Sequence, residues 1–347
     1  MFKVLTIGSA TIDLFVESDD ANIVSVCTKN RNSDFMSYPY GSKIDIPEFS
    51  SNVGGGGINT ACNFANLGVD TSAIFKLGKD FYSEGILRFF ETKNVNLNNI
   101  IQKEDTTTGC SVILVSFQGD RTVLAHRGAN SCINIDEINL QAIKDADLLY
   151  IAPLNGDSNK IIEPIIKTAT DAGTKICFNA GTTSLKKGYE HIKKILDAAH
   201  VVVLNKEEAS LATGIEVRPD TKVEKYSNET IHPDIKTMLT KLKVKDYQVI
   251  VITDGKKGAY AYEGEKFYFC ETFPSPVVST LGAGDSFAST FCGAMYRNNK
   301  DVGKALMYGS VNSAAVVSKF GATEGLLTFE EIEAKLASRP DYTYLIG

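Results

Sequence analysis

The sequence predicts an α/β protein with a mostly parallel central sheet that carries helices on both faces. Short apolar segments alternate with segments of helical periodicity between residues 71 and 252, a pattern typical of parallel strands joined by helices. The apolar segments are continuous runs, such as residues 201–204, which indicates strands buried on both faces. Of the 347 residues, 43% are hydrophobic, enough for a large core. We therefore predict three layers, α/β/α, with a small additional β-sheet.

Each element follows from a local pattern. A helix is expected where apolar residues recur every three or four positions, and a strand where a short apolar run ends at a turn residue. The polar residues 214–232 show no period and are expected to form a surface insertion. The expected strands are 3–8, 71–77, 147–152, 175–178, 200–204, 248–252 and 259–262. The expected helices are 56–67, 81–92, 159–171, 189–198, 206–212, 233–243, 284–298, 301–318 and 328–337.

Two stretches interrupt this alternation of strand and helix. Residues 109–127 have the pattern of a β-hairpin that turns at Gln118-Gly119-Asp120. Residues 14–53 contain short strand-like pieces and a polar loop at 28–34. We interpret both stretches together as a small β-sheet lid. The large domain then consists of residues 1–13, 54–108 and 128–347.

The composition argues against several classes of partner. The formal net charge is −6, so no attraction to nucleic acid or to an anionic membrane is expected. No apolar stretch approaches the length of a membrane-spanning helix, and residues 1–8 resemble a strand rather than a signal peptide. The seven cysteines are scattered without a Cys-x-x-Cys pair. This distribution is typical of reduced thiols and predicts a cytoplasmic protein.

Residues 279–285, Ser-Thr-Leu-Gly-Ala-Gly-Asp, carry the strongest chemical signal. They lead into an apolar helical pattern, and a glycine turn at a helix start leaves backbone N–H groups free to bind an anion. Asp285 beside such a site could accept a proton from an attacking hydroxyl, and phosphoryl transfer requires both features. Taken alone, the tetrapeptide 282–285 is more often an ordinary turn with Asp285 as a helix N-cap.

A second glycine run, Gly54-Gly55-Gly56-Gly57, precedes Asn59. Glycine costs conformational entropy in a helix or strand, so the run indicates a close approach of the backbone to a ligand. Asn59 would then offer a donor and an acceptor to hydroxyl groups. A flexible hinge is a compatible alternative. Asp13, after the first strand, could hold two vicinal hydroxyls, although a turn or capping role explains it as well.

Two further polar groups follow predicted strands, where ligands bind to an open parallel sheet. Asn205 and Glu208 are three positions apart and would share one face of a helix. They could orient waters around a magnesium ion or simply form a capping box. Residues 253–258, Thr-Asp-Gly-Lys-Lys-Gly, are either a tight turn or a loop under a nucleotide.

Competing motifs are incomplete. Gly78-Lys79 and Gly303-Lys304 lack the rest of a Walker A loop, and the glycine pair before Asp285 lacks the third glycine of a dinucleotide fingerprint. A serine hydrolase would need Ser286 within hydrogen-bond reach of a base. The candidate His200 begins an apolar strand, which is more typical of a core residue. The other histidines show no metal-ligand spacing.

These residues resemble the ribokinase-like, or PfkB-type, carbohydrate kinases. The resemblance runs from Met1 to about Pro340 and rests on two signatures in the family's order and spacing, residues 54–68 and Thr280-Leu-Gly-Ala-Gly-Asp285. It implies a ribokinase-like three-layer α/β/α fold with a β-sheet lid. It also implies phosphorylation of a hydroxymethyl group of a sugar or sugar-like substrate, with ATP and magnesium.

The resemblance implies roles for individual positions. Asp285 would be the catalytic base, and the amides of Gly282, Ala283 and Gly284 would form the anion hole. The implied sugar contacts are Asp13, Gly55, Gly56, Asn59 and Asn155. The implied nucleotide and phosphate contacts are Asn205, Glu208, Thr253, Gly255, Gly258 and Asn312, with Glu208 acting on magnesium through water. Arg127-Gly-Ala-Asn130 resembles the segment that leaves the lid.

Two departures from the family pattern bear on specificity. Ser279-Thr280 stands where the family usually has Asp-Thr. That aspartate helps to bind the cation in potassium-activated members, so the change argues against potassium activation. Asn155 stands in place of a carboxylate, and with the long 17–52 stretch it argues against ribose itself.

Two alternatives to a sugar kinase stay open. A nucleoside kinase would use the same scaffold, which accepts ribose carrying a base. A catalytically silent sugar-binding protein would need neither the base nor both glycine elements, which are intact. In each case the partner is a small molecule rather than nucleic acid or membrane, and the resemblance implies a homodimer through the lid.

Overall fold

The computed structural model describes the chain except for residues 1, 30, 118–120, 187, 219–230 and 298–300. Within the described chain the central sheet has ten strands. In spatial order they are β18 (Tyr344–Ile346), β17 (Lys266–Cys270), β16 (Ala259–Glu263), β15 (Val249–Thr253), β14 (Val201–Asn205), β13 (Lys175–Asn179), β12 (Leu148–Ile151), β1 (Lys3–Ile7), β6 (Asp70–Ile74) and β8 (Val95–Asn96). Neighbours from β15 to β8 are parallel, whereas β16, β17 and β18 add antiparallel pairs at one edge.

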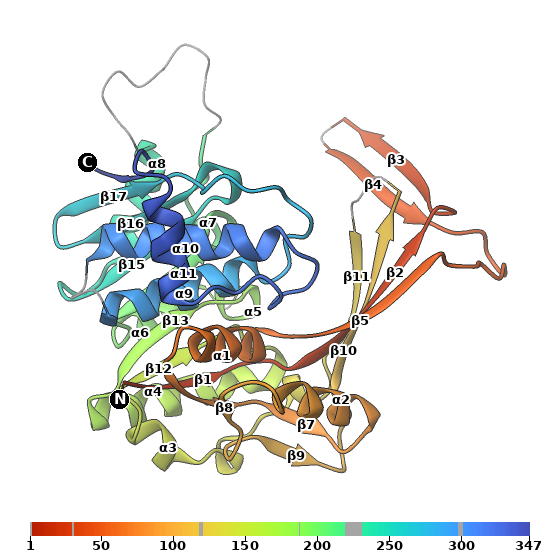
Figure 1. The fold of residues 1–347 in the computed structure, drawn as a ribbon, viewed down its shortest axis with the longest axis horizontal. Coiled ribbons are helices and arrows are strands. Elements are labelled where there is room, and N and C mark those ends of the chain that lie inside the picture. Colours follow the sequence, from red (N-terminus) through yellow and green to blue (C-terminus); the bar gives the residue numbers. More distant parts are fainter. Residues whose placement is uncertain (1, 30, 118–120, 187, 219–230, 298–300) are drawn as a thin grey trace.

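Helices cover both faces of this sheet (Figure 1). Alternate strand residues enter opposite cores: Val201 and Val203 pack in one, Val202 and Leu204 in the other. The core of Val202 contains residues from α3 (Leu140–Lys144), α4 (Ile162–Ala172), α5 (Thr182–Leu185), α6 (Tyr189–Leu196), α7 (Lys206–Thr213) and α8 (Pro233–Leu242). The core of Val201 contains residues from α1 (Gly56–Asn66), α9 (Ala283–Arg297), α10 (Val302–Val317) and α11 (Phe329–Ala337). The predicted three-layer α/β/α fold is confirmed.

A separate four-stranded sheet projects from one side of the molecule (Figure 1). Its order is β11 (Arg121–His126), β10 (Gly109–Ser116), β2 (Thr11–Ser18) and β5 (Glu48–Gly54). A hairpin of β3 (Asn22–Thr28) and β4 (Arg31–Ser37) extends it. The predicted polar loop at 28–34 is therefore wrong. Antiparallel pairing needs only backbone groups, and most β3 side chains are exposed, so no apolar pattern reveals these strands.

Other boundaries differ by small amounts. The predicted strand 71–77 is divided between β6 and β7 (Lys76–Gly78), and β7 pairs with β9 (Ile101–Lys103) instead of joining the central sheet. A further helix, α2 (Phe81–Phe90), packs with α1 in a third, smaller core. Short 3₁₀ turns are η1 (Gly128–Ser131), η2 (Ile135–Glu137), η3 (Gly156–Ile161) and η4 (Gly255–Lys257). The predicted turn at 118–120 and most of the segment 214–232 lie outside the described residues. Among the described helices, none has the length and apolar character needed to cross a bilayer.

Asn130 joins the small sheet to the body. Its Nδ2 donates to Ala10 O and its Oδ1 accepts from Ala10 N, both at 2.8 Å, immediately before β2 begins. A Cβ on Gly109, the first residue of β10, would collide with Asn130 Nδ2. The starts of β2 and β10 thus both pack against the buried side-chain amide of Asn130.

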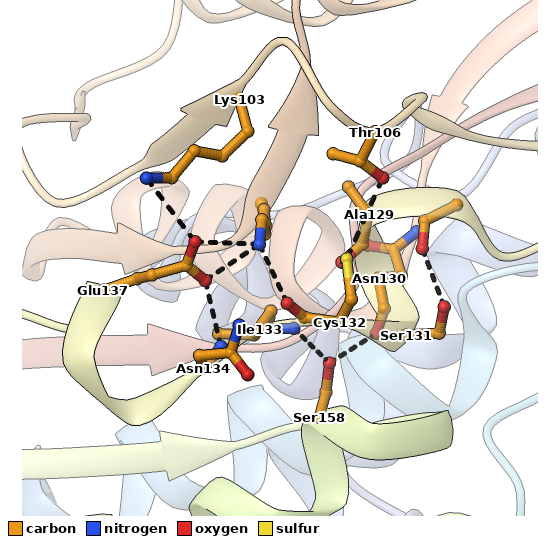
Figure 2. A network of polar contacts seen from close by, with 12 residues as sticks. Lys103, Thr106, Ala129, Asn130, Ser131, Cys132, Ile133, Asn134, Glu137 and Ser158 are labelled. Atoms are coloured by element: carbon orange, nitrogen blue, oxygen red, sulfur yellow. Dashed lines mark hydrogen bonds and ion pairs between the residues drawn. The ribbon is translucent and has the colours of Figure 1, made fainter.

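A polar network holds the segment that carries Asn130 (Figure 2). Ser158 Oγ accepts from Ile133 N at 2.8 Å and donates to Asn130 O at 2.9 Å. At the other end, Lys76 Nζ lies 2.8 Å from Glu137 Oε2 and donates to Cys132 O at 2.8 Å. The ion pair therefore fixes the base from which the small sheet projects.

The ion pair generates a stability prediction. The side chains of Lys76 and Glu137 are 5% and 14% exposed. Burial raises the pKa of Glu137, but hydrogen bonds from Lys76 and Asn134 outweigh it and hold the pKa below its usual value. Glu137→Gln leaves the Lys76 ammonium buried without a counter-charge, so we expect a loss of about 3 kcal/mol in the free energy of unfolding, measured by denaturant titration.

Because the pKa of Glu137 is lowered in the folded protein, this contribution is present at neutral pH and disappears on acidification below the usual glutamate pKa. Glu104→Gln serves as the control, because the Glu104–Lys79 pair is exposed, and it should change little. Equal effects of the two variants at pH 7 would contradict the prediction.

Candidate active site

Polar residues predicted from the sequence gather at the carboxyl edge of the parallel strands. Asn205 ends β14 and lies in register with Thr253, which ends β15. Asn155 follows β12 by four residues and is the N-cap of η3. Its Oδ1 accepts from Thr183 Oγ1 at a long 3.5 Å. This is the edge at which open parallel sheets bind ligands.

The amino end of α9 has the backbone geometry of an anion site. Gly282 has φ +72°, and a Cβ there would lie 2.5 Å from Ala322 O, so both its conformation and its surroundings require glycine. Two hydroxyls, Ser286 Oγ and Ser313 Oγ, donate to Ala283 O at 3.0 Å and fix the first turn. The first N–H groups of a helix have no partner within it, which leaves these amides available to a bound anion.

Asp285 lies in the first turn of α9 and is not its N-cap, because the helix begins at Ala283. Its Oδ2 accepts from Asn59 Nδ2 at 2.8 Å, and a Cβ added to Gly56 would lie 3.6 Å from its Oδ1. Burial raises the pKa of Asp285, while the hydrogen bond from Asn59 lowers it. The predicted base and the predicted glycine run are thus in contact, although 226 residues separate Asn59 from Asp285.

Asn59 brings an unpaired acceptor to this contact. The residue is 7% exposed, and within the described chain its Oδ1 is buried without a hydrogen-bond partner. An unpaired buried acceptor costs free energy, and nearly all such atoms in native proteins find partners. The Nδ2 of Asn59 is therefore paired with Asp285, and its Oδ1 is available to a hydrogen-bond donor.

The glycine run has a structural cause that the sequence did not reveal. Gly55 has φ +98°, and a Cβ on it would lie 2.6 Å from Ser9 O. Gly57 packs in the same way on Gly8. Glycine is required at both positions, because the start of α1 packs directly on the backbone of Gly8 and Ser9, which follow β1. Gly56 faces Asp285, and the approach of its backbone to a ligand stays a prediction.

Asp13 lies on β2 of the small sheet rather than in a turn. Burial raises its pKa, and hydrogen bonds with Ser111 and Thr11 lower it. A Cβ on Gly54 would collide with Asp13 Oδ2. Since Gly54 and Gly56 face Asp13 and Asp285 respectively, one short glycine segment lies against both carboxylates.

Asn205 and Glu208 form the capping box that the sequence left as an alternative. Asn205 Oδ1 accepts from Glu208 N at 2.8 Å, and Glu208 Oε2 accepts from Asn205 N at 3.0 Å. Burial raises the pKa of Glu208 to about 7, and the negative charges of Glu207 and Asp285 add to the rise. Glu208 is therefore close enough to Asp285 to be affected by its charge.

The loop after β15 is the tight turn that the sequence allowed. Asp254 N donates to Gly258 O at 2.8 Å, and Asp254 forms an ion pair with Lys206. Gly258 has φ +114°, and a Cβ there would collide with Cys270 O. Gly255 is exposed and has φ +52°. The loop is rigid where Gly258 packs and open to solvent at Gly255.

Asn312, for which the resemblance implies a nucleotide contact, lies in the core. The residue is fully buried. Its Nδ2 donates to Asn63 Oδ1 at 2.9 Å and to Thr290 Oγ1 at 2.7 Å, and its Oδ1 accepts from Leu327 N at 2.9 Å. These bonds occupy the amide within the core between α1, α9 and α10. A contact of Asn312 with the nucleotide stays a prediction.

The structure also adds residues that the sequence did not single out. Arg121 Nη2 donates to Thr280 Oγ1 at 2.9 Å, which connects the outer strand β11 with the loop before α9. Ser111 on β10 and Asn52 on β5 flank Asp13 in register. Strand register depends on distant pairing, so no local pattern identifies these residues.

The hydrolase interpretation is excluded by geometry. Ser286 Oγ donates to Ala283 O, and His200 immediately precedes β14, at the opposite edge of the sheet from Asp285. A cavity of about 720 Å³ lies at that opposite edge and is lined by Lys175, His200 and Val249 among others. Its lining contains none of the site residues that the resemblance implies. Among the described residues no group of three or more His, Cys, Asp or Glu could hold a metal ion.

Comparison with known proteins agrees with this geometry. The family model described as pfkB family carbohydrate kinase matches residues 1–328. The chain is 26% identical over 295 residues to the ribokinase of Staphylococcus aureus (strain COL), covering 84% of this chain and 91% of that one. It is 26% identical over 299 residues to the 5-dehydro-2-deoxygluconokinase of Shouchella clausii (strain KSM-K16), covering 82% and 86%.

A further relative is longer. The chain is 26% identical over 338 residues to the bifunctional ribokinase/ribose-5-phosphate isomerase A of Fructilactobacillus sanfranciscensis, and the match covers 96% of this chain but only 56% of that protein.

Solved structures show the same fold. The Arabidopsis thaliana ribokinase complexed with ribose and ATP superposes with a TM-score of 0.76 at 22% identity, covering 97% of this chain and 99% of that one. The Methanocaldococcus jannaschii nucleoside kinase gives 0.73 at 21% identity, covering 97% and 99%. The chain belongs to the pfkB family of carbohydrate kinases and is a phosphotransferase of the sugar and nucleoside kinase type.

Proposed function

We propose that the protein transfers the γ-phosphoryl group of ATP to a hydroxymethyl group of a sugar or sugar-like substrate. The observation that carries this proposal is the position of Asp285. It is a carboxylate in the first turn of α9, beside the open amides and hydrogen-bonded to Asn59. Similarity to a ribokinase and to a 5-dehydro-2-deoxygluconokinase supports a sugar-like acceptor.

In the proposed reaction the acceptor oxygen forms a bond to the γ-phosphorus while the bond to the ADP oxygen breaks. Asp285 takes the proton of the acceptor hydroxyl, since its burial raises its pKa and so its basicity. The amides of Gly282, Ala283 and Gly284 stabilise the charge on the transferring group.

Substrate positioning falls to residues that lie around Asp285. Asn59 would accept from a sugar hydroxyl through its unpaired Oδ1. We assign the remaining sugar contacts to Asp13, Asn155 and the backbone of Gly55 and Gly56.

We place the nucleotide over the loop at Thr253, Gly255 and Gly258, beside Asn205. Magnesium fits next to Glu208, because the raised pKa of Glu208 comes in part from the like charge of Asp285, which a cation would relieve. With single carboxylates rather than a cluster of ligands, Glu208 would hold the ion through water. The bound ion would neutralise charge on the phosphate oxygens.

We propose that the small sheet acts as a lid that excludes water during transfer. The contact between Arg121 and Thr280 supports this role, because it brings the lid strand β11 to the loop of the anion site. The lid also exposes Phe35, Phe49 and Leu124, which are 54%, 61% and 57% exposed. Exposed apolar side chains of this kind are typical of interfaces and support a homodimer formed through the lid.

Replacement of the base tests the proposal. Asp285→Asn keeps the shape of the side chain but cannot accept the proton, so we expect turnover to fall by roughly 10²–10⁴. The fold should be retained, because a carboxylate disfavoured by burial is replaced by a neutral amide. Release of ADP with a panel of sugars and nucleosides measures turnover, and nucleotide affinity is measured separately by titration.

Asp171→Asn is the matched control, because Asp171 is exposed on α4 and pairs only with Lys167 on its own helix among the contacts described. It should keep normal turnover. Near-normal turnover of Asp285→Asn would remove the base from the mechanism.

Glu208 gives a prediction for pH. Its pKa is raised from the usual 4.5 to about 7 in the folded protein, so the folded state binds the proton more tightly than the unfolded state. The contribution of Glu208 to stability is therefore fully present below pH 4.5 and is lost as the pH rises to about 7. Glu208→Gln keeps the capping box and should remove this part of the slope, which is on the order of 1–3 kcal/mol.

The measurement is the difference in free energy of unfolding between wild type and Glu208→Gln at pH 5 and pH 8 without magnesium. Glu190→Gln is the control, because Glu190 is exposed on α6 and is not among the charges that raise the pKa of Glu208. An identical pH slope in wild type and Glu208→Gln would show that Glu208 titrates normally.

A further inference from the structure

Asn52 on β5 has a buried donor that the proposed mechanism does not use. Within the described chain its Nδ2 is buried and has no hydrogen-bond partner. The residue lies between the lid and the loop after α10, since a Cβ on Gly321 would be 3.8 Å from Asn52 Oδ1. Buried amide groups are normally paired, so this position calls for a partner that the described residues do not supply.

Asn52 is part of a polar row across the lid sheet. In register, Asn52 on β5 pairs with Asp13 on β2, and Asp13 pairs with Ser111 on β10. Residues directly opposite one another on neighbouring strands share a face of the sheet. Asp13 contacts the glycine run at Gly54. The row therefore lies at the end of the lid nearest to the glycines that meet Asp285.

The chemistry of this row matches hydroxyl groups. An ionised Asp13 only accepts hydrogen bonds, and Asn52 Nδ2 only donates. A hydroxyl does both, so one hydroxyl or a vicinal pair would satisfy Asp13 and Asn52 together. Beside Asp285, Asn59 Oδ1 is a buried acceptor without a hydrogen-bond partner among the described residues. An unpaired donor at Asn52 and an unpaired acceptor at Asn59 suit a compact molecule with several hydroxyls.

Aromatic packing closes the next position along the strand. Side chains two residues apart on a strand share a face, so Phe15 follows Asp13 on the same side of β2. Phe15 is 6% exposed, and its ring meets that of Phe320 edge-on at 4.8 Å between centroids. Ile113, the register partner of Phe15 on β10, is 2% exposed. A group larger than the sugar would have to separate this pair.

We propose that Asn52 recognises substrate hydroxyls together with Asp13, and that the substrate is a compact sugar or polyol rather than a nucleoside. The inference rests on the proposed kinase function. The Phe15–Phe320 pair is the barrier that rejects a base attached to the sugar. The pair lies next to the polar row, on the side of β2 that runs away from the body.

The test compares monosaccharides, polyols and nucleosides as acceptors with ATP, using ADP release. For the wild type we expect sugars or polyols to give the highest kcat/KM. Asn52→Ala should raise KM for the preferred acceptor about tenfold, the effect of one lost hydrogen bond, while kcat changes little because the base and the anion site are intact. Phe320→Ala should raise kcat/KM for nucleosides relative to sugars.

Ser51→Ala is the matched control on the same strand. Ser51 is exposed, and its side chain lies on the other face of β5, so KM should stay at the wild-type value. Equal melting temperatures of the three variants and the wild type show that folding does not cause the change in KM.

A wild-type preference for nucleosides, or an unchanged KM in Asn52→Ala, would overturn the inference and leave the kinase function standing. An unchanged ratio of nucleoside to sugar turnover in Phe320→Ala would overturn the role of the aromatic barrier. Absence of ADP release with every acceptor would overturn the proposed function itself, and the inference with it.

Discussion

The contact between Asn59 and Asp285 is the interaction on which the rest of the site depends. A hydrogen bond of 2.8 Å joins the first turns of α1 and α9, and these helices lie in the same layer on the central sheet. Below it, Asn63 Nδ2 donates to Ser289 Oγ at 2.7 Å and to Thr290 Oγ1 at 2.8 Å. The buried amides fix how the two helix starts face each other. The hydrogen bond from Asn59 thereby orients the Asp285 carboxylate in the first turn of α9.

Close backbone packing gives this arrangement its rigidity. Gly55 and Gly57 let α1 start directly against the end of β1, and Gly282 lets α9 start against Ala322. Any side chain at these positions would displace a helix start, because protein interiors cannot absorb such overlaps without strain. Burial raises the pKa of Asp285, and burial together with the charges of Glu207 and Asp285 raises the pKa of Glu208.

The small sheet is attached to the body through hydrogen bonds near the predicted site residues. Asn130 holds Ala10 at the start of β2, and Ser158 joins Asn130 to η3, whose N-cap is Asn155. At the far end of the lid, Arg121 reaches Thr280 in the loop before α9. Hydrogen bonds thus connect the lid to the body at both ends. If the small sheet acts as the proposed lid, a ligand between these two attachments would contact groups from the body and from the lid at once.

The sequence by itself determined the three layers, the order of most strands and helices along the chain and the segments that carry the predicted site residues. Continuous apolar runs such as residues 201–204 identify strands buried on both faces, and glycine before an apolar helix predicts an anion site, because both inferences depend on local periodicity and backbone freedom. The register of the strands and the contacts between residues far apart in the sequence were decided only by the tertiary structure.

The structure alone placed Asn52 and Ser111 beside Asp13, exposed the β3–β4 hairpin and put Asn312 in the core. Strand pairing and side-chain burial depend on residues tens to hundreds of positions away. For that reason a local pattern could identify Asp13 and Asp285 as candidates, while only the folded chain could show which groups surround them.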